Sequence, residues 1–98
     1  MSVDENGGMI ADGGVYDLCR RKVGAAVRER RKELGFSQEG FAQSARIDRA
    51  RYGRIERGDM NLTLDTLCSL AAHLRTSPAQ LLRHVSESDC ADQIITDA

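Results

Sequence analysis

The sequence predicts a compact all-α domain built of five helices with short connections. Apolar residues recur with helical spacing in successive segments, each later segment begins at a residue suited to start a helix, and no segment alternates as a strand would. The chain has 98 residues, which is enough for one domain with a modest core. We therefore expect a single small helical domain.

The first three helices follow from apolar spacing and from the residues at their ends. The first is predicted over residues 15–34, and Gly35 suits the left-handed turn that ends a helix. Ser37 offers a side-chain oxygen to cap a short second helix, and Asp48 does the same for a third. Gly58 is expected to close the third helix.

Two further helices complete the predicted domain. Thr63 is the expected cap of the fourth helix, whose buried stripe comprises Leu64, Leu67, Leu70, Ala71 and Leu74. Ser77 and Pro78 start the fifth helix, because proline is favoured at the first helical position. The apolar face of this last helix comprises Leu81, Leu82 and Val85.

Composition divides the chain into three parts. Residues 1–14 are polar and glycine-rich and are expected to form a flexible arm, residues 15–85 the folded domain, and residues 86–98 an acidic tail. Ile94 and Ile95 are apolar enough to dock, so we expect partial order in the tail. No secretion signal or membrane-spanning stretch is found, which favours a cytoplasmic protein without membrane association.

Positive charge is concentrated in the middle of the chain although the net charge is -1. All fourteen Lys and Arg residues lie between Arg20 and Arg83, together with seven acids, so this segment carries +7. Four acids lie on each side of it. A basic body between acidic ends is typical of proteins that bind phosphate backbones, although a solvated charged surface would give the same pattern.

The cysteines and histidines do not form a catalytic or metal-binding pattern. Cys19, Cys68 and Cys90 are odd in number and widely spaced, so we interpret them as free thiols, with Cys68 a small core residue on an apolar helix face. His73 and His84 lack a partner at the spacing of a zinc site or a catalytic triad. We therefore expect no enzyme activity, no metal and no cofactor.

The second and third predicted helices have the form of a helix-turn-helix. About three residues separate them, and the third exposes Arg49, Arg51 and Arg54. The major groove of DNA admits one helix, and an arginine there donates two hydrogen bonds to the O6 and N7 of guanine. Gly53 removes a side chain and would allow close approach to DNA. A solvated arginine surface is the alternative.

Several ordered motifs identify a family. The segments 37–42 (SQEGFA), 47–49 (IDR), 55–58 (IERG) and 61–67 (NLTLDTL) resemble the Cro/lambda-repressor-like (Xre) helix-turn-helix family over roughly residues 23–82. Within that family, Arg49, Gly53, the 55–58 segment and Asn61 are similar to the small controller proteins of restriction-modification systems. The resemblance implies a lambda-repressor-like fold and binding to double-stranded DNA.

The resemblance also implies roles for individual residues. Those that would face base edges are Asp48, Arg49, Ala50 and Arg54, with Asp48 available only if it is not occupied as a cap. Those that would contact phosphates are Ser37, Gln38, Arg46, Arg51, Asn61 and Thr63. Gln38 would in addition brace the start of the recognition helix. Arg31 would form a structural ion pair with Glu56.

Three residues depart from the family pattern. Arg46 stands where a glycine is usual in the turn, and a left-handed backbone there would be strained unless a phosphate contact compensates. Gly40 lies inside the second helix at a cost of about 1 kcal/mol. Tyr52 replaces an aliphatic residue, so its hydroxyl must find a partner or reach the surface.

These features together predict a homodimeric regulator of transcription that represses by occluding a promoter at an inverted repeat, with activation left open. Leu81, Leu82 and Val85 are the candidate dimer interface, unless Leu81 or Leu82 completes the monomer core instead. Its activity is more plausibly regulated by a protein partner or by its own concentration than by a small molecule. The rival hypothesis is an antitoxin-like or adaptor protein whose main partner is another protein.

Overall fold

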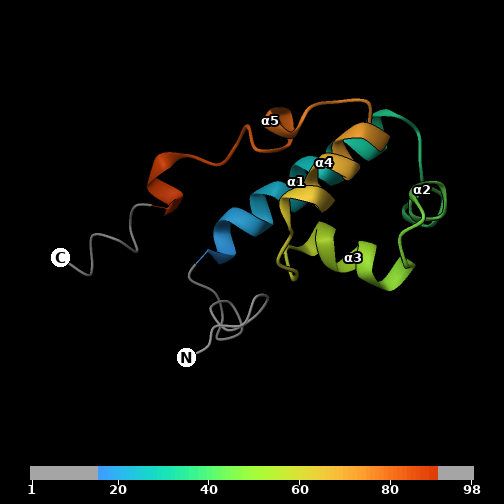
Figure 1. Ribbon diagram of the computed structural model, residues 1–98, viewed down its shortest axis with the longest axis horizontal. Helices are drawn as coiled ribbons and strands as arrows, with labels where there is room; N and C mark the ends of the chain where they lie inside the picture. The colour runs from blue at the N-terminus through green and yellow to red at the C-terminus, as the bar shows by residue number, and fades with distance from the viewer. Residues whose placement is uncertain (1–15, 91–98) are drawn as a thin grey trace.

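The computed structural model describes residues 16–90, which form an all-helical domain (Figure 1). Its helices are α1 (Asp17–Glu33), α2 (Gln38–Ala45), α3 (Arg49–Arg57), α4 (Leu64–His73) and α5 (Pro78–Leu81). Residues 87–90 are helical as well, and no strand occurs between residues 16 and 90. The predicted fold class is confirmed. The expectations for the N-terminal arm and for Ile94 and Ile95 lie outside the described residues.

Side-chain caps fix where three of the longer helices begin, at the positions that the sequence predicts. The Oγ of Ser37 accepts a hydrogen bond from the backbone N–H of Gly40 at 2.9 Å, and the Oδ2 of Asp48 accepts one from that of Arg51 at 3.0 Å. Thr63 caps α4 in the same manner. A Cβ on Gly40 would lie 3.0 Å from the Ser37 Oγ, so glycine inside α2 leaves this cap uncrowded.

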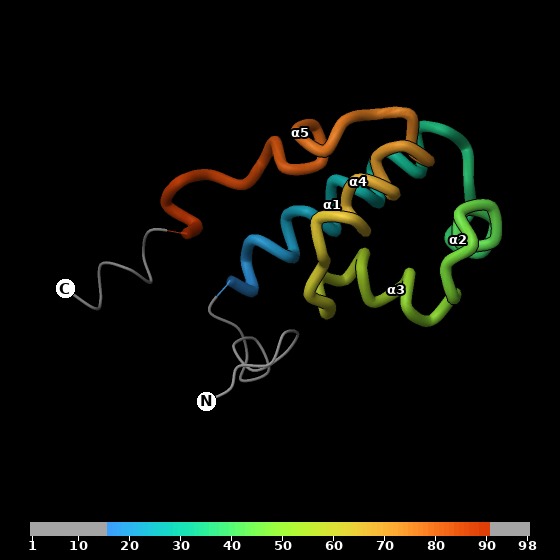
Figure 2. Tube along the Cα trace, viewed as in Figure 1, coloured from blue at the N-terminus to red at the C-terminus, as the bar shows by residue number. Residues whose placement is uncertain are grey.

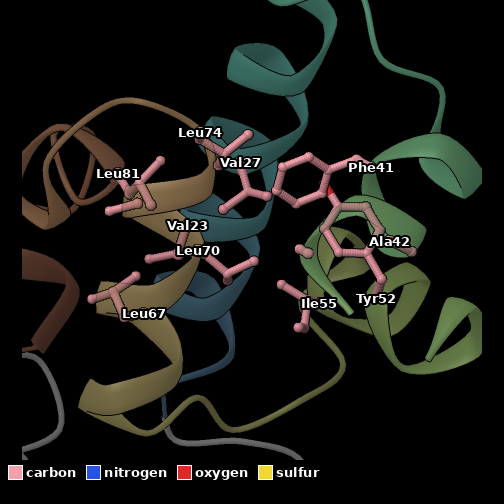
Figure 3. Close-up of a cluster of buried hydrophobic side chains, with 12 residues drawn as sticks. Val23, Val27, Phe41, Ala42, Tyr52, Ile55, Leu67, Leu70, Leu74 and Leu81 are labelled. Carbon is pink, nitrogen blue, oxygen red and sulfur yellow. The ribbon is translucent and has the colours of Figure 1, made fainter. Parts of the chain in front are cut away.

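Side chains from all five helices meet in one core (Figure 3). Phe41 of α2 and Tyr52 of α3 are fully buried in it, with ring centroids 5.1 Å apart. The aliphatic members around them include Val23, Val27, Ile55, Leu67, Leu70, Leu74 and Leu81. Because α2 and α3 each bury one face here, their other faces are left for solvent or a ligand.

Glycine allows α1 to approach the last turn of α3 very closely. A Cβ on Gly24 would lie 2.5 Å from the carbonyl oxygens of Ile55 and Glu56, closer than real Cβ contacts allow. At the end of α3, Gly58 has a φ of +79°, and a Cβ there would lie 2.6 to 2.8 Å from atoms of Arg21. These two contacts set the position of α3 against α1.

After α4 the chain runs back along α1 toward the N-terminal end of that helix (Figure 2). Successive contacts mark this path along α1. Arg30 donates to the carbonyl of Leu74 at 2.8 Å, Glu29 pairs with Arg83 at 2.7 Å, and Lys22 pairs with Asp89 at 2.9 Å. Figure 1 shows α5 on the side of α1 and α4 that faces away from α3.

Two residues that the sequence places in the core are exposed. Leu64 is 71% exposed because it is the first residue of α4, and this turn extends beyond the core. Cys68 is also exposed. The buried stripe of α4 follows Leu67, Leu70 and Leu74, and the residue next to Leu67 is turned about 100° away from it.

We predict that Gly24→Ala lowers the free energy of unfolding by about 2 to 3 kcal/mol, because the added methyl must separate α1 from the carbonyls of α3. Gly35→Ala is the matched control, since nothing lies within 4 Å of a Cβ there and only its φ of +85° opposes the substitution. Its cost should be about 1 to 2 kcal/mol. Urea unfolding followed by circular dichroism measures both. Equal costs would show that the close approach is unimportant.

Candidate nucleic-acid interface

The turn between α2 and α3 is tight and left-handed. Arg46, which ends α2, has a φ of 60° and a ψ of 43°, so the left-handed backbone expected at this position is present. The backbone N–H of Ile47 bonds to the carbonyl of Ala42 at 2.9 Å, which closes the end of α2. Asp48 then caps α3 at once. The two helices of the motif are thereby held at a fixed angle.

The two faces of α3 differ sharply in burial. One face packs against the core through Tyr52, Ile55 and Glu56, which are buried. The other face is exposed and comprises Arg49, Ala50, Arg51, Arg54 and Arg57. An exposed helix face with four arginines carries the positive charge and the guanidinium donors that the major groove of DNA accepts. The predicted base-facing residues therefore lie together on the outer side of α3.

Gly53 lies beneath two arginine side chains. A Cβ at this position would be 3.2 Å from an Nη1 of Arg49 and 3.3 Å from that of Arg57. The guanidinium groups of Arg49 and Arg57 thus cover the backbone of Gly53, which has no side chain of its own. Arg57 was missed by the sequence analysis, although it lies on the same face, one turn after Gly53, and its exposed side chain pairs with Asp59 at 3.2 Å.

A buried carboxylate joins α1, α2 and α3. The Nε of Arg31 donates to Glu56 Oε2 at 2.7 Å, and its Nη2 donates to Oε1 at 3.1 Å. Gln38 donates from Nε2 to Oε1 at 2.8 Å, and the Tyr52 hydroxyl donates to Oε2. Arg31 also donates to the carbonyl of Phe36 at 2.8 Å. The ion pair implied by the family resemblance is thus part of a larger network.

The network determines the protonation of its members. Burial favours the neutral form of Glu56 and raises its pKa, but hydrogen bonds from Arg31, Tyr52 and Gln38 outweigh this, so the net pKa is lowered. The hydrogen bond to Glu56 raises the pKa of Arg31. Burial, followed by the hydrogen bond to Glu56, raises the pKa of Tyr52. Glu56 is therefore ionised, and Tyr52 is a neutral donor.

Several of the predicted DNA contacts already have partners within the protein. Asp48 Oδ2 and Ser37 Oγ are occupied as helix caps, as is the Oγ1 of Thr63. Gln38 braces Glu56 in the last turn of α3 and not the start of that helix, because its Nε2 reaches inward to the carboxylate. Arg46 and the other predicted phosphate contacts Arg51 and Asn61 are exposed.

The predicted dimer set is divided by the fold. Leu81 is 1% exposed and belongs to the monomer core, because the end of α5 turns it toward α4 and α1; it is therefore not available to a partner. Leu82 is 40% exposed. It lines a largely apolar groove of about 450 Å³ together with Val85, and the other walls come from the start of α1, the 61–62 loop, α4 and Cys90.

A family comparison classifies the chain. The helix-turn-helix family model HTH_3 matches residues 27–81, more than half of the chain, so the chain belongs to this family. Family members of this Xre-like type are DNA-binding regulators of transcription, and the resemblance seen in the sequence is confirmed. A comparison with curated proteins gives no match.

Solved structures of regulators share the fold. The restriction-modification controller protein C.AhdI from Aeromonas hydrophila is 35% identical over 67% of this chain and 96% of its own, with a TM-score of 0.63. The clp gene regulator ClgR from C. glutamicum is 26% identical over 76% of this chain and 88% of its own, with a TM-score of 0.63. A Vibrio cholerae HTH_3 transcriptional regulator is 26% identical, with a TM-score of 0.65, but the match covers 71% of this chain and 39% of that longer one.

Residues 16–90 contain neither a cluster of metal ligands nor a membrane-spanning helix. In this part of the chain no group of three or more His, Cys, Asp or Glu side chains is placed to hold a metal ion. None of its helices is long and apolar enough to cross a membrane.

We predict that Glu56→Gln lowers the free energy of unfolding by about 3 to 5 kcal/mol at pH 7, because it leaves Arg31 buried without a counter-charge. The folded-state pKa of Glu56 lies below its unfolded value of 4.5. Its stabilising contribution is therefore complete above that pH and is lost as the pH falls through the lower folded value.

The stability difference between the wild type and Glu56→Gln should thus be constant above about pH 4.5 and should narrow as the pH falls below it. Denaturant titrations from neutral to acidic pH measure this narrowing. Glu33→Gln is the control, since Glu33 forms an exposed pair with Arg30 and should change stability little at any pH. A difference between wild type and Glu56→Gln that stayed constant down to pH 3 would contradict the assigned role of the carboxylate.

Proposed function

We propose that this protein is a homodimeric, sequence-specific regulator of transcription that inserts α3 into the major groove of DNA. The observation that carries the proposal is the division of α3 into a face buried in the core and an outer face of arginines. The buried face fixes the helix, and the outer face has no apolar residue larger than Ala50 to impede entry into the groove. We assign the DNA-binding domain to residues 15–85. We place the action of the protein in the cytoplasm.

Base reading is assigned to the outer face of α3. Arg49 and Arg54 would donate bidentate hydrogen bonds to guanine, and Ala50 would contact a thymine methyl group. Asp48 is the weaker member of this set, since one of its carboxylate oxygens already caps α3. The guanidinium groups of Arg49 and Arg57, which lie over Gly53, would come close to the bases, because Gly53 has no side chain to separate the helix from the DNA.

Phosphate contacts are assigned to residues at the edges of the helix-turn-helix: Ser37, Gln38, Arg46, Arg51, Asn61 and Thr63. Arg46 supports this assignment, because a left-handed arginine in a position that favours glycine suggests a use for its side chain. The N-terminal ends of α2 and α4 would add favourable dipoles toward phosphate. Contacts of this kind set the position of the protein on DNA and carry little sequence information.

The regulatory role is proposed from the relatives. C.AhdI is a restriction-modification controller protein and shares 35% identity with nearly all of its length covered, so we assign this chain the same kind of role. Repression by occlusion of a promoter, including that of its own gene, is the simplest mechanism. A small protein with one DNA-reading unit blocks polymerase wherever its site overlaps the promoter.

Dimerisation is proposed because a single recognition helix reads too few base pairs for useful specificity. Leu82 and Val85 are the partly exposed members of the predicted interface, and both line the apolar groove. Contact between two copies through this face would be isologous and would present two α3 helices to an inverted repeat. The groove would also suit a different protein partner, as the antitoxin-like or adaptor hypothesis requires.

Selection of bound duplexes from a random pool, followed by titration of the selected duplex across salt concentrations, tests the proposal. We expect an inverted repeat with guanines in each half-site and an affinity that falls steeply with salt. The double variant Arg49→Ala/Arg54→Ala is the control and should select no such motif. Failure of the wild type to enrich any motif would instead favour a protein partner as the main target.

We predict that Arg54→Ala relaxes sequence preference, whereas Asn61→Ala weakens binding to all duplexes by a similar factor. Loss of a bidentate contact should reduce discrimination at one guanine by about 1 to 3 kcal/mol. Arg54→Lys keeps the charge but not the planar fork, so it should retain affinity better than specificity. Fluorescence anisotropy on the selected duplex and on versions with single changes separates these effects. Uniform losses in both alanine variants would contradict the base-contact assignment.

We predict that Leu82→Glu/Val85→Glu yields a folded monomer with weak binding to the selected duplex, because charges in the groove oppose association. Leu64→Glu is the matched control, since Leu64 is more exposed than Leu82 and does not line the groove. Sedimentation velocity gives the oligomeric state, and circular dichroism checks the fold. An intact dimer in the double variant would show that the interface lies elsewhere.

A further inference from the structure

Two cysteines far apart in the sequence lie side by side where the end of the described chain meets α1. The Sγ atoms of Cys19 and Cys90 are 3.8 Å apart, across 71 residues of sequence. Cys19 is half-buried on α1, and its Sγ lies 3.7 Å from the carbonyl oxygen of Asp89. Cys90 is exposed to solvent. No comparable sulfur contact is found for Cys68 among residues 16–90, so the proximity is specific to one pair.

An ion pair between Lys22 and Asp89 holds the segments that carry the two thiols next to each other. Lys22 Nζ donates to the two carboxylate oxygens of Asp89 at 3.1 and 2.9 Å, and the Asp89 side chain is 6% exposed. The same carboxylate accepts from the backbone N–H of Ser86 at 2.8 Å, which closes the first turn of the 87–90 helix. Asp89 thereby fixes Cys90, the next residue, against the turn of α1 that carries Cys19 and Lys22.

We propose that Cys19 and Cys90 are a reversible thiol–disulfide site that clasps residues 86–90 to α1. A disulfide needs an S–S separation of about 2.05 Å, so rotation of the side chains must bring the sulfurs closer by roughly 1.8 Å. The Cys19 side chain already contacts the backbone of Asp89, the residue before Cys90. This modification is separate from DNA reading and does not rest on the proposed regulatory function.

The chemistry uses a peroxide or a small-molecule disulfide as the oxidant. With hydrogen peroxide, the Cys90 thiolate attacks one peroxide oxygen, forms a sulfenic acid and releases hydroxide. The Cys19 sulfur then attacks the Cys90 sulfur, and water leaves with the proton of Cys19. Two electrons pass from the thiol pair to the peroxide. With oxidised glutathione, the Cys90 thiolate attacks one sulfur, breaks its S–S bond and releases one glutathione thiolate. Cys19 then attacks the Cys90 sulfur of the mixed disulfide, gives up its proton, and displaces the second glutathione thiolate.

The environments of the two thiols match these different roles. Cys90 is exposed and therefore accessible to the oxidant. Burial raises the pKa of Cys19, and the neighbouring Cys90 raises it further, so Cys19 is less readily ionised and is disfavoured as the thiol that first attacks the oxidant. Its proximity to the Cys90 sulfur places it for the second, resolving step. Both sulfurs line the apolar groove beside Leu82 and Val85. The clasp therefore fixes one edge of the face that we assign to association.

Equilibration of the full chain in glutathione buffers of graded redox potential tests the proposal. Samples are quenched with acid, alkylated, and analysed by intact mass and peptide mapping. We expect the mass of a single chain lowered by about 2 Da, one Cys19–Cys90 linked peptide pair, and a higher melting temperature for the oxidised form. Cys68→Ser should behave as the wild type does, whereas Cys19→Ser and Cys90→Ser should form no internal disulfide.

A second comparison tests the part played by the ion pair. Lys22→Gln should lower the equilibrium constant for the internal disulfide several-fold, while Lys32→Gln, an exposed position on the same helix, should leave it unchanged. The proposal is overturned if the oxidised protein is linked through Cys68, if it forms only disulfides between chains, or if glutathione remains attached to Cys90 without displacement by Cys19.

Discussion

The carboxylate of Glu56 is the group on which the arrangement of this domain depends. It lies in the last turn of α3 and accepts hydrogen bonds from Arg31 of α1, Gln38 of α2 and Tyr52 of α3 itself. An ionised group in a core is costly unless it is fully paired, and here both oxygens are satisfied. Because hydrogen bonds are directional, this arrangement specifies how the three helices meet more sharply than apolar packing alone would do.

The outer face of α3 is free for function because its inner face is so closely held. Gly24 lets α1 approach the carbonyls of the last turn of α3, and Gly58 lets the chain leave that helix beside Arg21. The arginines then gain exposure without loss of core packing. A rigidly placed helix loses little conformational freedom on binding, so its side chains can be used for discrimination.

Local features of the fold could be predicted from the sequence, and contacts between distant segments could not. Ser37, Asp48 and Thr63 act within three residues of themselves, so their capping roles are visible in the sequence. The prediction that Leu64 and Cys68 lie in the core is wrong. Helical spacing indicates which face of a helix is apolar, but it does not show how far along that face the neighbouring helices extend. The close approach at Gly24 and the pairing of Lys22 with Asp89 depend on how α1 meets segments over thirty residues away. The exposure of Arg49, Ala50 and Arg54 could be predicted, because it follows from the helical spacing of α3 alone. The contact of Gln38 with Glu56 could not, because it depends on how α2 meets α3.

Methylation interference on the selected duplex tests most directly whether α3 reads the major groove. Dimethyl sulfate methylates the N7 of guanine in the major groove and the N3 of adenine in the minor groove, and each modification blocks an acceptor that the protein could use. Our account predicts that N7 methylation of guanines at symmetric positions, about one helical turn apart, prevents binding. Interference at adenine N3 alone, or at no base, would contradict it.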